Sequence, residues 1–284
     1  MSDLILSVRG LNKSFGGKRG LLARPGAVKH AVQDVSFDLR RGESLGIVGE
    51  SGSGKSTVAR LITRLTESDG GTILLEGRDF LALRDEELRR GRQAIQMVFQ
   101  DPYASLNPRK TIGASIAGPL RERAEPMPAA AIEERVRALL GDVGLNPPAR
   151  YSGRFPKDLS GGQRQRVGIA RAIAAGPRII VADEPVSALD VSVRAQVLNL
   201  FNDLRRDKGL SYVFISHDLD VIRSTCDQVA VMQSGRIVET GPVTRILDAP
   251  QHSYTRQLVA SSLRPDPSLY QKRKIQGAAA GPAL

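Results

Sequence analysis

The sequence predicts an α/β fold with a mainly parallel sheet, and three observations support this prediction. Short apolar runs typical of buried strands alternate with amphipathic helical patterns in the first and last thirds of the chain. A glycine-rich loop lies between one of these strands and the helix that follows it. Hydrophobic residues make up 41% and charged residues 25% of the 284 residues, which is ordinary for a globular protein and excludes wholesale disorder.

The N-terminal region should contain two strands separated by an irregular loop. Leu4 to Val8 and Ala31 to Leu39 have the apolar character of short strands, and the second shows clear alternation. Residues 16–30 between them are rich in glycine and include a proline. They predict a flexible surface insertion without regular structure.

A buried strand and an amphipathic helix should come next. Ser44 to Val48 is apolar and strand-like, and three glycines separate it from a helical pattern. One face of that helix carries Val58, Leu61, Ile62 and Leu65. We expect this face to be buried.

Residues 101–158 differ in character from the segments on either side. They hold many prolines, few strand signals, and Arg-rich helical stretches such as Ile132 to Leu140. We therefore expect a helical subdomain at about 101–158.

The α/β alternation returns after this segment. Strands are expected at Ile179 to Ala182 and Tyr212 to Ser216, joined by a helix that buries Val193, Val197, Leu200, Phe201 and Leu204. A hairpin should follow, formed by Val229 to Met232 and Arg236 to Glu239. Two short helices should come after it, around Val243 to Leu247 and Tyr254 to Leu263. Residues 1–263 thus form the predicted domain, and 264–284 a flexible C-terminal tail.

Composition narrows the possible functions. No run approaches the roughly 18 to 20 apolar residues of a membrane-spanning helix, and the N-terminus lacks the features of a secretory signal, so we expect a cytoplasmic location. The single cysteine, Cys226, can form neither an internal disulfide nor a multi-thiolate metal site, and we expect it to be a packing residue. The net charge of +11 would suit nucleic acid, but the basic residues are scattered and aromatic residues make up only 4%, so no nucleic acid is expected as a partner.

A phosphate-binding pattern stands between the strand at 44–48 and its helix. The pattern G-x-x-x-x-G-K-[ST] is matched by Gly49, Glu50, Ser51, Gly52, Ser53, Gly54, Lys55 and Ser56. The glycines let backbone N–H groups turn toward phosphate oxygens, the helix N-terminus adds a positive dipole, and Lys55 reaches the β and γ phosphates. An ordinary glycine-rich turn is the alternative, which the strand-loop-helix context disfavours. We predict that this loop and Thr57 bind ATP, and that Ser56 binds Mg²⁺.

Two adjacent carboxylates follow the strand Ile179 to Ala182. Consecutive residues of an extended strand point to opposite sides, so Asp183 and Glu184 should differ in role. Asp183 can reach the Mg²⁺ region, and Glu184 can position and deprotonate a water that attacks the γ-phosphate. The alternative is a solvated acidic turn before Pro185.

A second glycine pair precedes the long helix that begins near residue 161. Ser160 and Gln163 fit a capping box, which would be a sufficient explanation if the segment stood alone. Gly161 and Gly162 leave the helix N-terminus open to an anion, however. Because a phosphate loop occurs elsewhere in the chain, we expect a second phosphate contact here.

With these motifs, the sequence resembles the nucleotide-binding subunit of ATP-binding cassette (ABC) transporters over nearly its whole length. The family's motifs occur in order, and besides those above they are Gln100 after the strand Ile95 to Phe99, the signature Leu159 to Gln163, Ser187-Ala188-Leu189-Asp190, and His217. The resemblance implies a P-loop NTPase core of the ABC ATPase type, with an antiparallel β subdomain and a helical subdomain.

The resemblance also implies roles that spacing does not assign. Gln100 would sense Mg²⁺ and couple to the membrane partner, and His217 would contact the γ-phosphate. Without the family context, His217 is more often a structural residue. Asp190 would cross a dimer interface, and the signature would bind nucleotide in trans, so that two ATP molecules lie between two such domains. Phe15 occupies the place of the aromatic that stacks on adenine, with a core or surface phenylalanine as the alternative.

Three segments resemble dipeptide and oligopeptide importers, in particular their second ATPase: Asp101 to Arg109, Glu184 to Gln196, and His252 to Thr255. This implies a second ATPase subunit in a heterodimer (a homodimer being the alternative), two permease subunits, and an extracytoplasmic solute-binding protein. The chain would be a peripheral protein at the cytoplasmic face of a bacterial inner membrane. Relatives with a similar ATPase import nickel, sugars or other solutes, so the cargo stays open, and a soluble ABC ATPase acting on nucleic acid is the remaining alternative. Many relatives carry clustered cysteines for an iron–sulfur centre in a longer tail, and with only Cys226 no cluster is predicted here.

Overall fold

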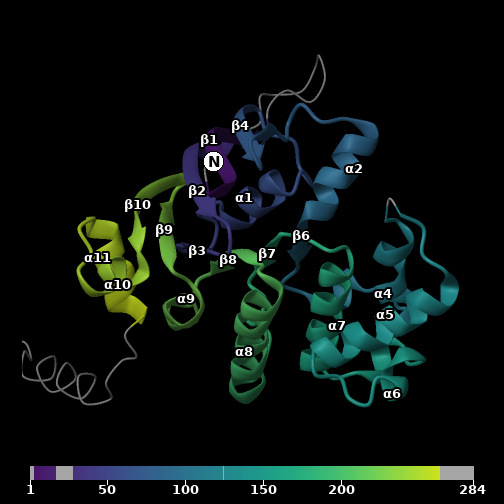
Figure 1. The fold of residues 1–284 in the computed structure, drawn as a ribbon. Coiled ribbons are helices and arrows are strands. Elements are labelled where there is room, and N and C mark those ends of the chain that lie inside the picture. The colour runs from purple at the N-terminus through teal and green to yellow at the C-terminus, as the bar shows by residue number, and fades with distance from the viewer. Residues whose placement is uncertain (1–2, 17–27, 124, 263–284) are drawn as a thin grey trace, which may run out of the picture.

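A six-stranded sheet forms the centre of the computed structural model, which describes residues 3–16, 28–123 and 125–262 (Figure 1). The strand order is β10-β9-β3-β8-β7-β6. The strands are β3 (Ser44–Val48), β6 (Ile95–Val98), β7 (Ile179–Asp183), β8 (Ser211–Ser216), β9 (Gln228–Gln233) and β10 (Arg236–Pro242). Every neighbouring pair from β9 to β6 is parallel, and β10 pairs with β9 as an antiparallel hairpin. The predicted parallel sheet and the predicted hairpin are therefore confirmed.

The side chains of the central strands alternate between two apolar cores. Val181 and Ile215 point into one core, shared with α1 (Lys55–Ile62) and the N-terminal strands. Ile180 and Phe214 point into the other, which α8 (Val191–Lys208) and α9 (Leu219–Thr225) cover. Strands β7 and β8 are buried at every position because both faces of the sheet are covered, as parallel sheets require.

An antiparallel sheet of order β2-β1-β4-β5 covers the α1 side. Its strands are β1 (Leu4–Phe15), β2 (Lys29–Arg40), β4 (Gly70–Leu75) and β5 (Arg78–Asp79). The first two are longer than predicted, and residues 29–30, expected in the loop, belong to β2. Residues 17–27 of the predicted insertion lie outside the described residues. The antiparallel region implied by the family resemblance is present.

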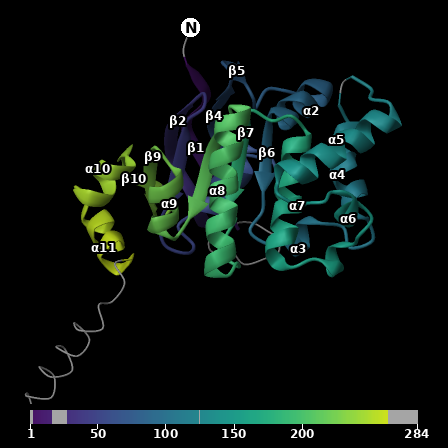
Figure 2. The same cartoon turned by 60° about the horizontal axis from the view of Figure 1, so that its bottom comes forward.

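Helices fill the segment between β6 and β7 (Figure 2). They are α3 (Pro102–Ser105), α4 (Ile112–Arg121), α5 (Ala129–Asp142), α6 (Ala149–Ser152), the 3₁₀ turn η1 (Pro156–Asp158) and α7 (Gly161–Ala174). Helix α7 packs against both α4 and α5, so the helical region continues beyond residue 158. On the opposite side of the molecule, α10 (Val243–Asp248) and α11 (Ser253–Ser262) lie beside β9 and β10, and the predicted tail at 264–284 is outside the described residues. In the described part of the chain no helix is both long enough and apolar enough to cross a membrane.

Helix α1 is shorter than its apolar pattern predicts. It ends at Ile62, and Arg64 adopts a left-handed backbone conformation with φ of 52°. Leu65 therefore leaves the helical face and is 54% exposed, so its predicted burial is wrong. The expected burial of Val58, Leu61 and Ile62 is confirmed.

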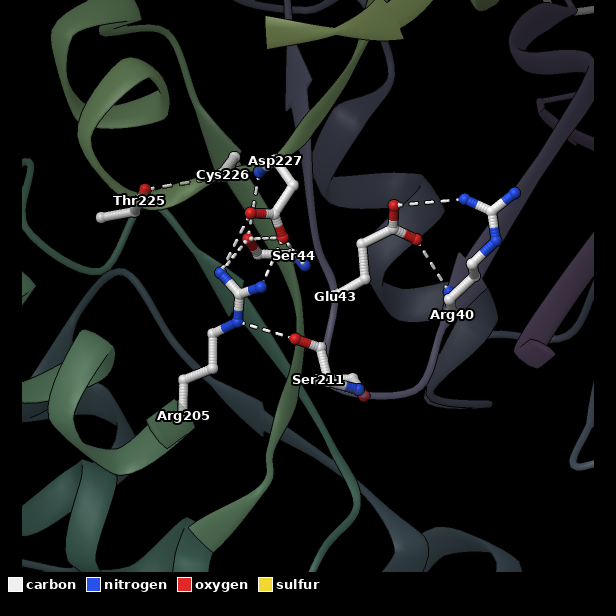
Figure 3. Close-up of polar contacts among 9 residues, drawn as sticks. Arg40, Glu43, Ser44, Arg205, Ser211, Thr225, Cys226 and Asp227 are labelled. Atoms are coloured by element: carbon white, nitrogen blue, oxygen red, sulfur yellow. Dashed lines mark hydrogen bonds and ion pairs between the residues drawn. The ribbon is translucent and has the colours of Figure 1, made fainter. Parts of the chain in front are cut away.

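A polar network anchors the N-terminal ends of the strands (Figure 3). The Arg205 guanidinium donates to the carboxylate of Asp227, at 2.5 and 3.3 Å, and to Ser44 Oγ at 3.0 Å. Asp227 also accepts from the Ser44 N–H and hydroxyl, and Cys226 lies next to it, partly buried against the α8 core. Burial raises the pKa of the Cys226 thiol to about 12, in keeping with a packing role. The network therefore ties the strands together at their N-terminal ends. The glycine-rich loop lies at the other end of the strands, after the C-terminus of β3.

Candidate nucleotide-binding and catalytic site

The glycine-rich loop at 49–54 connects β3 directly to α1, as the pattern predicts. Gly54 has φ of 107°, and a Cβ built there would lie 2.2 Å from the Ala31 carbonyl oxygen. Gly49 has φ of 151°, and its Cβ would lie 2.1 Å from the Met232 carbonyl oxygen. Only glycine fits these two positions, because the loop runs tightly against the backbone of β2 and β9.

Lys55 is folded into the middle of this loop. It is 5% exposed, and its Nζ donates to the carbonyl oxygens of Gly49 at 2.7 Å and Glu50 at 2.8 Å. Burial lowers the pKa of Lys55, while the nearby carboxylates of Glu184 and Asp183 act against that shift. The ammonium group thus lies where the loop closes on itself, at the base of α1.

Ser56 and Asp183 meet across 127 positions of sequence. The Ser56 hydroxyl donates to Asp183 Oδ1 at 2.9 Å, and Asp183 is only 6% exposed at the end of β7. Burial raises the pKa of Asp183, and the hydrogen bond from Ser56 partly offsets this. A hydroxyl and a carboxylate placed together provide the hard oxygen donors that Mg²⁺ prefers, so these residues fit the predicted ion.

Glu184 lies just beyond β7 and does not follow strand alternation. Its φ is 46°, an unusual left-handed conformation for a glutamate, and its backbone N–H donates to the Ile215 carbonyl at 2.9 Å. Asp183 contacts Ser56, and Glu184 lines the same cleft as Ser56, so both carboxylates lie near the glycine-rich loop; strand alternation does not apply to Glu184, because β7 ends at Asp183. A side chain held in a strained backbone conformation is a feature that clusters at functional sites.

The Glu184 carboxylate receives two neighbours that the sequence separates widely. Gln100 Nε2 donates to Glu184 Oε2 at 3.1 Å, and His217 Nδ1 lies 3.1 Å from Glu184 Oε1. The Glu184 side chain is 18% exposed and the His217 side chain 59% exposed. The Glu184 side chain is thus mostly buried and paired rather than solvated, and His217 is exposed rather than part of the core.

Phe15 ends β1 with its ring 44% exposed, which excludes a core role. The Lys13 ammonium lies 5.6 Å from the centre of that ring. Phe15 shares a cleft of about 550 Å³ with the loop and the catalytic candidates, a volume in the range of small-molecule sites. The lining residues are Phe15, Lys29, Ala31, Ser51, Gly52, Gly54, Lys55, Ser56, Thr57, Gln100, Glu184 and His217.

A larger hollow of about 710 Å³ lies elsewhere, between α2 (Asp85–Ala94) and the ends of α4 and α7. Its charged lining mixes arginines with glutamates, and it contains no part of the glycine-rich loop. The smaller cleft is therefore the candidate site.

The signature residues and Asp190 do not line this cleft among the described residues. Ser160 and Gln163 form the capping box expected from their spacing, with Gln163 N–H to Ser160 Oγ at 3.3 Å and Ser160 N–H to Gln163 Oε1 at 3.0 Å. Asp190 is exposed at the N-cap position of α8. One chain thus brings together the loop, the two carboxylates, Gln100, His217 and Phe15, and leaves the signature and Asp190 outside.

Two contacts at the site were not predicted. The Tyr254 hydroxyl, from α11, accepts a hydrogen bond from the Glu50 N–H at 3.0 Å, and Tyr254 is 5% exposed. The Ser187 hydroxyl lies 3.4 Å from Gln100 Nε2 and donates to the Glu184 carbonyl at 3.1 Å. No spacing rule links position 254 to position 50, so only the fold reveals the first contact.

Known proteins resemble this chain in both sequence and fold. A family model described as "ABC transporter" matches residues 32–187, more than half of the chain. The chain belongs to the ABC transporter family. Two similar curated ABC proteins are the glutathione import ATP-binding proteins GsiA of Salmonella paratyphi A and Escherichia coli K12. Each is 49% identical over 271 residues, which is 95% of this chain and 43% of the relative. This ABC chain therefore spans less than half the length of these relatives.

Solved structures give the same answer for the fold of this ABC chain. The cassette MJ0796, in a dimeric post-hydrolysis state bound to ADP and Pi, matches with a TM-score of 0.73 and 29% identity, covering 84% of this chain and 98% of that one. CbiO1 from Clostridium perfringens, part of the ABC transporter complex cbiONQ, matches with a TM-score of 0.73 and 24% identity, covering 96% of this chain and all of that one. The predicted ABC ATPase fold is confirmed.

Proposed function

We propose that this chain binds and hydrolyses ATP as the subunit that energises an ABC importer of dipeptides or oligopeptides. The observation that carries the proposal is the cleft that Glu184 shares with the glycine-rich loop, in which Ser56 donates a hydrogen bond to Asp183. The identity of 49% to proteins named for glutathione import supports a small-peptide cargo, because glutathione is itself a tripeptide. Import of another small solute by the same ATPase is the alternative.

The cleft can hold ATP with residues from four parts of the chain. The backbone N–H groups of the loop and the N-terminus of α1 would bind the phosphates, and Lys55 would exchange its carbonyl contacts for phosphate oxygens. Ser56, Asp183 and Gln100 would hold Mg²⁺, which when bound would neutralise charge on the β and γ phosphates. Thr57 and Phe15 also line the cleft, and the exposed ring of Phe15 would stack on the adenine.

Glu184 is the group positioned to act as a base. In the proposed step, a water oxygen forms a bond to the γ-phosphorus, the bond from that phosphorus to the β–γ bridging oxygen breaks, and Glu184 accepts the water proton. Gln100 and His217 each hold one carboxylate oxygen of Glu184, which fixes its orientation. His217 is exposed and lines the same cleft, and in this proposal it contacts the γ-phosphate.

The site needs a second chain. Ser160, Gly161, Gly162 and Gln163 do not line the cleft of their own chain, and in this proposal they contact nucleotide bound by another subunit. ATP would then be enclosed between two cassettes in head-to-tail arrangement, with Asp190 at the seam. The partner in this proposal is a different ATPase subunit, and the pair works with two permeases and a solute-binding protein at the cytoplasmic face of a bacterial inner membrane.

Reconstitution in proteoliposomes tests this proposal. The tagged chain would be purified with its associated subunits from detergent-solubilised native membranes, and uptake of radiolabelled dipeptide and glutathione would be compared with uptake of nickel and a sugar. ATP-dependent peptide uptake is expected. Uptake of nickel or sugar alone would contradict the peptide cargo and retain the importer role. Purification without permeases, together with ATP turnover stimulated by DNA or RNA, would contradict the importer role itself.

A further inference from the structure

The first turn of α8 contacts both the signature and the loop that carries His217. Val193 packs against the signature, where its Cγ1 lies 2.3 Å from the position a Cβ would take on Gly162. Arg194, the next residue, forms an ion pair with Asp218 at 2.9 Å between Nη1 and Oδ2. Asp190, at the N-cap of the same helix, accepts the Arg194 N–H at 2.8 Å. This turn therefore joins the signature, the Asp190 segment and the residue that follows His217.

The N–H and both carboxylate oxygens of Asp218 form hydrogen bonds that hold the loop carrying His217. Its Oδ1 caps α9 by accepting from the N–H groups of Asp220 and Val221, at 3.0 and 3.4 Å. Its own N–H donates to the Ser216 hydroxyl at 2.9 Å. The remaining oxygen, Oδ2, is the one held by Arg194. His217 stands between Ser216 and Asp218, so its backbone is fixed on both sides.

The ion pair is shielded enough to matter. The Arg194 and Asp218 side chains are 31% and 30% exposed, and Arg194 Nε is fully buried without a hydrogen-bond partner among the described residues. A guanidinium in this position depends on its one carboxylate, because an unpaired and partly buried charge is costly. Loss of either partner should therefore shift the loop rather than leave it in place.

We infer that Arg194 is a positioning residue: through Asp218 it holds His217 against Glu184 and makes that contact follow the first turn of α8. The inference rests on the proposed ATPase function and deepens it. Since the same turn packs on Gly162, movement of the signature on a partner's nucleotide would be transmitted to the His217–Glu184 pair of this chain's own site. Among the described residues that line the cleft, neither Arg194 nor Asp218 is found, so ATP binding should not depend on their ion pair.

Three single variants, the Arg194→Gln/Asp218→Asn double variant and a matched control test this inference in the purified complex. Arg194→Gln removes the charge, Arg194→Lys restores it, and Asp218→Asn removes the carboxylate charge while keeping an equally good N-cap. Arg206→Gln is the control, because Arg206 lies on the same helix and, within the described part of the chain, forms ion pairs only with the exposed Asp203 and Asp207. The measurements are kcat and KM for ATP, with Tm recorded for each variant.

The inference predicts a specific pattern. Arg194→Gln and Asp218→Asn should each lower kcat about tenfold, equivalent to about 1.4 kcal/mol of activation free energy, with KM within about twofold of wild type. The double variant should be no slower than the slower single variant, because both remove one interaction. The kcat of Arg194→Lys should lie within about threefold of the wild-type value. The kcat of the control, Arg206→Gln, should equal the wild-type value.

Other outcomes overturn the inference. Wild-type kcat in Arg194→Gln and Asp218→Asn, or fully multiplicative losses in the double variant, would refute the positioning role and leave the ATPase function standing. A loss of kcat that tracks a fall in Tm, or that Arg194→Lys does not relieve, would show a merely structural pair. Absence of ATP turnover in the wild-type complex would overturn both this inference and the proposed function.

Discussion

Replacing Glu184 by glutamine separates ATP binding from hydrolysis. The carboxylate makes two side-chain contacts, to Gln100 Nε2 and His217 Nδ1, both at 3.1 Å. A glutamine amide keeps an oxygen that can accept from Gln100 and gains an NH₂ that can donate to a neutral His217 nitrogen. Both contacts can therefore persist, and the free energy of unfolding should change by less than about 1 kcal/mol.

The catalytic effect should be much larger. Loss of a general base lowers kcat by about 10²- to 10⁴-fold, which corresponds to about 2.7 to 5.4 kcal/mol of activation free energy. Phosphate release by the purified complex measures kcat, and fluorescent ATP binding measures affinity, which should stay within about threefold of wild type. The control is Glu43→Gln. The Glu43 side chain is similarly buried, at 15% exposure, but it contacts Arg40 at the opposite end of the strands. Unchanged turnover in Glu184→Gln, or equal losses in both variants, would refute the assignment of Glu184 as the base.

Three further predictions test other parts of the site. Tyr254→Phe removes the acceptor for the Glu50 N–H, so titration should show ATP affinity reduced about 2- to 10-fold, whereas Tyr151→Phe, in α6, should have no effect. Burial raises the pKa of Asp183, so the cost of its folded-state charge is present above the raised value and disappears as pH falls below the unfolded value. Accordingly, Mg²⁺ affinity should begin to fall at a higher pH than for an exposed aspartate, Asp183→Asn should bind Mg²⁺ weakly at every pH, and its ligand-free Tm should not fall; a flat wild-type profile would contradict this. Gly162→Ala would drive a Cβ to 2.3 Å from Val193 Cγ1, while the Val193 Cβ lies at 3.7 Å. ATP turnover should therefore fall in Gly162→Ala and recover in the Gly162→Ala/Val193→Ala double variant, and no recovery would exclude this steric cause.

Local patterns predicted the elements whose burial shows in the sequence. Strands β7 and β8 are continuous apolar runs because they are buried on both faces, and the glycine-rich loop is recognisable because all its parts lie within eight positions. Helix α2 was not predicted, since none of its residues is buried and Leu88 and Ala94 are its only apolar side chains. Strand β4 begins with Gly70 and Gly71 and was missed for the same lack of a local signal.

The arrangement of the candidate site depended on long-range contacts that the sequence could not show. Glu184 was predicted from the acidic end of its strand, and Gln100 and His217 from family motifs, but their mutual contacts exist only because the ends of β6, β7 and β8 are neighbours. Glu184 has a left-handed backbone conformation just beyond β7, so strand alternation could not predict where its carboxylate lies. The Tyr254 contact joins residues 204 positions apart, and no periodicity or motif predicts such a pair.

Equilibrium ATP binding to the Glu184→Gln protein tests the central claim most directly, because this variant should retain nucleotide without consuming it. With Mg²⁺ and the companion ATPase subunit present, we predict saturable binding of one ATP per chain. Adding Lys55→Met, which removes the ammonium held at 2.7 and 2.8 Å in the loop, should weaken that binding by at least about 100-fold, equivalent to about 2.7 kcal/mol. Absence of saturable binding with Lys55 intact, or equal binding in both proteins, would contradict the account.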